Sequence, residues 1–202
     1  SGHLPIQFFY ALITAFRQDI LKDRYPNFAE VKDYCHYSAN PIGQLLLYLA
    51  GQATRENLLL SDHICTGLQL INFAQDVVID LTQKNRCYIP MDELRSYNID
   101  LSDITNKIAS ENYTALIAKQ LARATEIYQQ GTALGQALPG FFGIEIRFII
   151  ACGQKILDKL NARKDIFARP IILKTDLLFL FFKIIFSRQN SPASTQPILE
   201  KL

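Results

Sequence analysis

Apolar side chains recur at intervals of three and four residues along almost the whole chain, and no stretch sustains the alternation typical of a strand. This pattern predicts an all-α protein. A helix that Asn27 can cap should kink at Pro41, because a proline inside a helix removes a backbone hydrogen bond. The other predicted helices span residues 5–23, 54–81, 111–136, 144–161 and 173–188, with short ones after Pro90 and near 103–109, the latter capped by Ser102.

The predicted helix over 54–81 is apolar except along one polar stripe. Four polar residues fall within about 80° of arc at 3.6 residues per turn: Gln69, Asn72, Asp76 and Asp80. Because the rest of the helix is apolar, it should be buried on most sides, and burying two ionised carboxylates without partners is costly. Carboxylates one turn apart, with amides above them, suit a hard, hydrated cation such as Mg²⁺.

Two further polar groups follow this helix. Arg86 and Tyr88 stand just before Pro90 and offer a fork of N–H donors and a phenol. Together with the carboxylates they predict a site for a metal-bridged diphosphate. On an exposed helix, an Asp-x-x-x-Asp pair would instead mean two solvated carboxylates that repel each other. The apolar surroundings of Asp76 and Asp80 favour the metal site.

The composition limits the class of protein. Of 202 residues, 49% are hydrophobic and 20% charged, as in a globular domain that buries a substantial core. A net charge of +2 without a basic run gives no reason to propose a nucleic-acid partner. Scattered cysteines without a CxxC motif predict reduced thiols in a cytoplasmic protein, and zinc is not expected. We expect one helical domain over 1–188 and a disordered tail over 189–202.

Two stretches resemble the squalene/phytoene synthase family. Residues 69–90 read Gln-x-x-Asn-x-x-x-Asp-x-x-x-Asp followed by Arg-x-Tyr-x-Pro, which is similar to the second aspartate-rich motif of that family. Residues 34–43, Tyr-Cys-His-Tyr-Ser-Ala-Asn-Pro-Ile-Gly, are similar to its Tyr-Cys signature. Both stretches are closest to the bacterial hydroxysqualene synthases of the hopanoid pathway. The resemblance implies the helical bundle of class I isoprenoid synthases.

The resemblance also implies a reaction. Mg²⁺ held by Asp76 and Asp80 would draw charge from a departing diphosphate. Arg86 and Tyr88 would bind the oxygens of that diphosphate. The substrate would be presqualene diphosphate or farnesyl diphosphate, and the product hydroxysqualene or squalene.

Three more residues receive roles from the resemblance. Tyr37 is expected to face the cavity and act in catalysis near the carbocation. Gln69 is expected to bind substrate, and either Gln69 or Asn72 to position the water that captures the cation. An Asn72→Leu variant that hydroxylates its product as before would contradict the role of Asn72.

The family has two aspartate-rich helices that face each other, and this sequence offers no counterpart of the first. Asp19 and Asp23 form another pair, but basic residues surround it, and we interpret it as a solvated helix end, with a secondary role for Asp19 left open. We therefore expect the chain to match the C-terminal two-thirds of such an enzyme and to be catalytically impaired alone. Turnover of an isoprenoid diphosphate at family-like rates would contradict this.

Other classes of function stay open at this point. A non-catalytic helical scaffold or assembly protein could use the same fold with an inactive site, and it need bind neither Mg²⁺ nor diphosphate. The apolar segment 177–186 could cover the core, lie against a membrane as a peripheral contact, or be left bare by something absent. Exposed apolar surface could also drive self-association.

Overall fold

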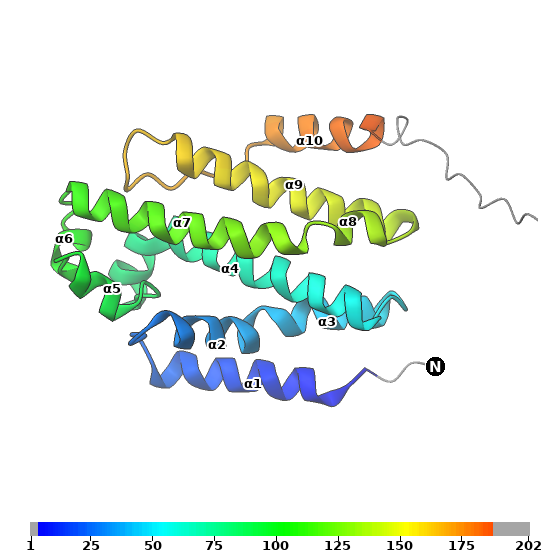
Figure 1. Cartoon of the computed structure of the whole chain (residues 1–202), viewed down its shortest axis with the longest axis horizontal. Coiled ribbons are helices and arrows are strands. Elements are labelled where there is room, and N and C mark those ends of the chain that lie inside the picture. The colour runs from blue at the N-terminus through cyan, green and yellow to red at the C-terminus, as the bar shows by residue number, and fades with distance from the viewer. Residues whose placement is uncertain (1–3, 188–202) are drawn as a thin grey trace, which may run out of the picture.

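A computed structural model describes residues 4–187 as a layered bundle of helices (Figure 1). These residues form ten helices, and their only bridge-type pairing is an isolated one between Arg24 and Cys87, so the predicted all-α class is confirmed. The predicted tail over 189–202 lies outside the described residues. The helices are α1 Ile6–Leu21, α2 Phe28–Ser38, α3 Asn40–Leu49, α4 Arg55–Lys84, α5 Met91–Ser96, α6 Leu101–Thr105, α7 Glu111–Gly131, α8 Leu134–Ala137, α9 Gly140–Ala162 and α10 Lys174–Ser187.

The long helix α4 is the centre of the bundle. It packs along α7 and also contacts α2, α3 and α9 (Figure 1). Gly67 permits the close approach to α7, because a Cβ there would lie 2.5 Å from the Cβ and 2.6 Å from the Cα of Tyr128. Gly131 does the same from the other helix, since its Cβ would lie 2.4 Å from the carbonyl oxygen of Leu60. The helix that carries the acidic stripe is therefore fixed on its packed side.

The helix that we expected to kink at Pro41 is two helices instead. α2 ends at Ser38 and α3 begins at Asn40, which places Pro41 in the first turn of α3. Proline is tolerated there because the first N–H groups of a helix have no partner within it. The hydroxyl of Thr66 on α4 donates to Asn40 Oδ1 at 2.9 Å, so the break is tied to the central helix.

The remaining helix ends need smaller corrections. Asn27 caps α2 as predicted, because its side chain accepts from the N–H of Glu30 at 3.1 Å. The helix predicted over 111–136 stops at Gly131, and the short α8 follows it. Ser102 is not the cap of α6, which begins at Leu101; there the Asp103 carboxylate accepts from the N–H of Asp100 at 3.1 Å.

The first helix, α1, turns most of its apolar stripe outward. It packs against α2 and α3 and buries Ala15. In Figure 1, α1 forms one outer edge of the bundle and α10 lies at the opposite edge. The exposed members of the stripe, between 45% and 83% accessible, are Ile6, Phe9, Ile13, Phe16 and Ile20.

Judged by length and composition alone, one helix in the described part of the chain, α4, could cross a membrane. However, 56% of its most apolar window is buried inside the bundle. That degree of burial is typical of a core helix.

Candidate functional site

The acidic stripe lies on the C-terminal half of α4 and becomes more buried toward the helix end. Asn72 is exposed, the Asp76 side chain is 14% exposed, and Asp80 is buried with 4% of its surface accessible. Buried carboxylates need compensating partners. Each of the two carboxylates has a cation beside it, but the two cations come from different parts of the chain.

Asp80 is paired within its own helix. Lys84 Nζ donates to Asp80 Oδ1 at 2.9 Å, one turn further along α4. The hydrogen bond and charge of Asp80 raise the pKa of Lys84. The Lys84 side chain is 58% exposed, so it can leave the carboxylate without disturbing the core.

Asp76 is paired across the bundle. Arg169, in the connection between α9 and α10, donates from Nε to Asp76 Oδ1 and from Nη2 to Oδ2, the latter at 3.2 Å. The amide of Asn72 also donates to Oδ2, at 3.1 Å. Gln75 donates to the carbonyl of Pro170 and so ties the same connection to α4. The hydrogen bond that Arg169 donates to Asp76 raises the pKa of Arg169.

Arg86 reaches α1, and the interpretation of Asp19 as a solvated residue was wrong. Arg86 Nη1 lies 3.0 Å from Asp19 Oδ1, and Nη2 donates to the Asp19 carbonyl at 2.6 Å. The Tyr34 hydroxyl donates to the same carboxylate oxygen at 2.8 Å. Asp23 is exposed, as expected, with 59% of its side chain accessible. The chain turn after α4, which begins at Asn85 (φ 49°), brings Arg86 back toward α1.

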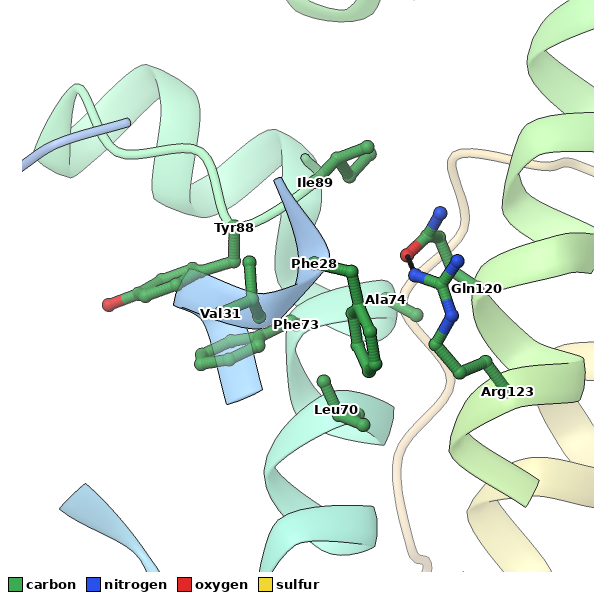
Figure 2. Close-up of a pocket in the computed structure, with 9 residues that line it drawn as sticks. All are labelled: Phe28, Val31, Leu70, Phe73, Ala74, Tyr88, Ile89, Gln120 and Arg123. Atoms are coloured by element: carbon green, nitrogen blue, oxygen red, sulfur yellow. Dashed lines mark hydrogen bonds between the residues drawn. The ribbon is translucent and has the colours of Figure 1, made fainter. Parts of the chain in front are cut away.

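Tyr88 joins this network through its hydroxyl and the core through its ring. Its hydroxyl accepts from Arg86 Nη1 at 3.1 Å, and its ring stacks on Phe73 with centroids 3.7 Å apart. Figure 2 shows these two rings beside a small cavity of about 10 Å³, which has room for about one water. The rings of Tyr25 and Tyr34 each lie 5.5 Å from that of Tyr88. The four rings therefore form a packed wall rather than a ligand pocket.

The hydroxyl of Tyr25 and Nε of Arg86 are buried with no hydrogen-bond partner among the described residues. Burial also raises the pKa of Tyr25, Tyr34 and Tyr88. These phenols therefore stay neutral at physiological pH. As neutral groups they can donate hydrogen bonds to anionic oxygens.

A larger hollow lies between α4 and α9, next to the acidic stripe. It is an open groove of about 350 Å³. Asn72 and Gln75 are its polar members, and the rest of its lining is apolar or small: Leu68, Ile71, Phe148, Ile149, Cys152, Gly153, Ile156 and Ile172. Because Asn72 contacts Asp76 directly, the groove begins beside a charged group and continues as an apolar surface.

Tyr37 and Gln69 have no described contact with the carboxylates. Tyr37 packs against the core, with its ring edge-on to His36. Tyr34 contacts Phe73 and Asn40 bonds Thr66, so α2 and α3 run antiparallel to α4. In that register Tyr37 lies between the Tyr34–Phe73 contact and the Asn40–Thr66 contact, at about the same level along α4 as half-buried Gln69.

The donor atoms at Asp76 and Asp80 fit Mg²⁺ in kind, since they are hard carboxylate oxygens. Within residues 4–187, no group of three or more His, Cys, Asp or Glu side chains gathers in one place. Mg²⁺ is often held by one or two carboxylates together with substrate phosphates. Asp76 and Asp80 could hold it in that way once Arg169 and Lys84 release them.

The helical bundle is shared with a solved squalene synthase. The structure superposes on squalene synthase HpnC from Alicyclobacillus acidocaldarius with a TM-score of 0.74 and 33% identity, covering 78% of this chain and 60% of that one. A hydroxysqualene synthase of Sinorhizobium fredii is 33% identical over 168 residues, which cover 83% of this chain and 57% of that protein. For a hydroxysqualene synthase of Rhodopseudomonas palustris the identity is 31%, over 78% of this chain and 54% of that protein.

The sequence model of the squalene/phytoene synthase family matches residues 1–176. The chain belongs to this family, as the two motifs predicted. It spans a little over half the length of the two hydroxysqualene synthases. The contact of Arg169 with Asp76 and the contact of Arg86 with Asp19 were not predicted for the site. Each of them joins residues that are far apart in the sequence.

Proposed function

We propose that this chain forms the diphosphate-holding part of a Mg²⁺-dependent isoprenoid synthase of squalene and hopanoid biosynthesis. Its substrate is presqualene diphosphate or farnesyl diphosphate, and its product hydroxysqualene or squalene. The observation that carries the proposal is the position of Asp76 and Asp80, one turn apart on α4 at the end of an apolar groove. A charged end and an apolar groove match a ligand with a diphosphate head and a hydrocarbon chain.

The charges around the stripe support this assignment. Lys84 and Arg169 balance the two carboxylates, and both side chains are about half exposed. Bound Mg²⁺ would supply positive charge to a leaving diphosphate. When the carboxylates turn to the metal, the lysine and the guanidinium are left close to the phosphate oxygens, where their charge is favourable.

Arg86 and Tyr88 serve as further donors in this proposal. Both are held in place before any ligand binds, Arg86 by Asp19 and Tyr88 by stacking on Phe73. Donors that are already oriented stabilise developing negative charge without a cost of reorganisation. Tyr37 on α2 and Gln69, which precedes Asp76 on α4, do not line the groove between α4 and α9. The roles of Tyr37 in catalysis and of Gln69 in substrate binding stay predictions.

Isothermal titration of the chain with inorganic pyrophosphate, with and without Mg²⁺, tests the proposal. We expect binding that requires Mg²⁺ and that weakens at least about tenfold in Asp76→Asn and in Asp80→Asn, because even outer partners of metal ligands contribute that much. Asp158→Asn is the matched control: Gln154 donates to Asp158 at 2.9 Å at an exposed position of α9, as Asn72 does to Asp76.

Unchanged binding in both site variants, or equal binding without Mg²⁺, would overturn the proposal and favour a helical scaffold. Turnover is a separate question. We propose that residues 1–202 alone turn over isoprenoid diphosphates slowly, because the described residues provide two carboxylates at the site and the family uses a second aspartate-rich helix. A turnover assay with Mg²⁺ measures this directly.

A further inference from the structure

The last described helix, α10, is apolar on nearly all sides. It packs against α9 and buries Leu180 at 6% exposure. A helix lying on a protein surface ordinarily has one apolar stripe and one polar face. In α10 seven large apolar side chains are 38% to 65% exposed, and two of them, Phe181 and Ile185, line a groove toward α9. The seven are Leu177, Leu178, Phe179, Phe181, Phe182, Ile185 and Phe186. Contiguous exposed apolar surface of this kind marks an interaction site.

Polar contacts at its first turn hold α10 against α9. Asp176 accepts from Lys159 and lies 3.6 Å from Lys155, both on α9. It also accepts from the backbone N–H of Leu173 at 2.8 Å. The helix is therefore fixed to α9 at its beginning, and it lies at the outer edge of the bundle (Figure 1).

The net positive charge of the chain lies in the sequence segment that ends with α10, where Lys155 and Lys159 also pair with Asp176. Residues 155–187 contain seven basic and three acidic side chains, a net charge of +4. Residues 1–154 contain twelve basic and fifteen acidic side chains, a net charge of −3. The apolar helix α10 thus belongs to the positive segment of an otherwise acidic sequence. This arrangement complements an anionic surface.

A second groove lies next to the one beside the acidic stripe. It lies between α9 and α10, has a volume of about 230 Å³, and is lined by apolar residues and Glu145. Phe148 of α9 lines both this groove and the groove beside Asn72. A hydrocarbon chain could therefore pass along α9 from the outer edge to the acidic stripe, a step that rests on the proposed function.

From these observations we propose that α10 is a membrane-surface helix that inserts its apolar side chains into the interface of an anionic bilayer. Apolar burial and attraction of the basic residues to anionic headgroups act together in such binding. A bilayer also explains the groove between α9 and α10, because an oily substrate or product would be exchanged there.

Vesicle flotation with the whole chain tests the proposal, using phosphatidylglycerol–phosphatidylcholine vesicles and, separately, pure phosphatidylcholine. The test variant is Leu178→Glu with Phe179→Glu, at positions 59% and 65% exposed. The control is Ile13→Glu with Phe16→Glu on α1 at the opposite edge, at positions 58% and 63% exposed. Both pairs add the same charge, and circular dichroism checks that both variants keep their helix content.

We expect the native chain to float with anionic vesicles and much less with pure phosphatidylcholine. The α10 variant should partition at least about tenfold less, and the α1 variant within about twofold of the native chain. No flotation of the native chain, or equal losses in the two variants, would overturn the proposal. A chain that does not float could instead form a dimer through α10. Sedimentation equilibrium without lipid, with the native chain dimeric and the α10 variant monomeric, would show this and would overturn the proposal.

The outcome is independent of the catalytic proposal. Flotation is measured without Mg²⁺ or diphosphate, and Asp76→Asn should float like the native chain. If pyrophosphate binding fails and flotation succeeds, the membrane helix stands and the synthase proposal falls. The reverse result removes the membrane helix alone.

Discussion

The two faces of α4 are built in opposite ways. One face meets α7 so closely that Gly67 has no space for a methyl group beside the Tyr128 backbone. The other face carries Asn72, Asp76 and Asp80, whose partners are side chains that water also reaches. Backbone contact resists change, whereas partly exposed ion pairs contribute little to stability. The same helix thus fixes the fold on one face and leaves groups free to exchange partners on the other.

The largest effect is expected on the packed face. Gly67→Ala would put a Cβ 2.5 Å from Tyr128 Cβ and 2.9 Å from its backbone nitrogen, so α4 and α7 must separate. Overpacking costs about 1–3 kcal/mol, and the helix propensity of alanine returns up to about 1 kcal/mol. We expect a net loss of about 2 kcal/mol in the free energy of unfolding, measured by urea denaturation.

Gly153→Ala on α9 is the matched control for that measurement. Its Cβ would meet the ends of two side chains, Leu68 Cδ2 at 2.6 Å and the Tyr128 hydroxyl at 2.7 Å, rather than backbone. The end of Leu68 can move, whereas the buried Tyr128 hydroxyl is held by the hydrogen bond that it donates to the Ile150 carbonyl. We therefore expect a loss smaller than that at Gly67. Equal losses at the two glycines would show that the α4–α7 contact is no more rigid than the rest of the bundle.

Substitutions at the polar face of α4 should change the affinity for a ligand more than the free energy of unfolding. In Arg169→Gln the Asp76 carboxylate loses a guanidinium that competes with a bound cation. An exposed ion pair is worth up to about 1 kcal/mol, so Mg²⁺ without diphosphate should bind about two- to fivefold more tightly, as measured by calorimetry. Stability should fall by less than about 1 kcal/mol.

Arg95→Gln, at an exposed position on α5, removes the same charge away from the stripe and serves as the control. Weaker Mg²⁺ binding in Arg169→Gln than in this control would contradict competition at Asp76. It would mean that Arg169 positions the carboxylate for the metal.

The difference between the faces also explains what could be predicted from the sequence. A period of 3.6 residues is local, so the long helix α4 was predicted over 54–81 and is observed over 55–84. The break before Pro41 was not predicted as such, because proline is compatible with either a kink or a first turn. Here the contact of Asn40 with Thr66, 26 residues away, accompanies a new helix start.

In the site too, the features that depend on local spacing could be predicted and the contacts between distant residues could not. The stripe of Asn72, Asp76 and Asp80 follows from spacing alone, and so does a lysine one turn after Asp80. Arg169 meets Asp76 from 93 residues away, and Arg86 meets Asp19 from 67 residues away. Such pairs depend on how the helices stack, and the sequence around Asp19 gave the opposite impression because its neighbours are basic.

The smallest expected effect concerns the local pair of Asp80 and Lys84. The hydrogen bond and charge of Asp80 raise the folded-state pKa of Lys84 above its ordinary value of 10.5. A raised pKa means that the stabilising contribution is present below 10.5 and is lost as pH rises through the folded-state value. Because Lys84 is largely exposed, Lys84→Gln should cost only a few tenths of a kcal/mol.

Urea denaturation of the native chain and Lys84→Gln, from neutral pH to above 10.5, measures that difference. The gap between the two curves should be constant at neutral pH and should close as the lysine deprotonates. A gap that persists at high pH would come from lost packing of the lysine stem and not from its charge.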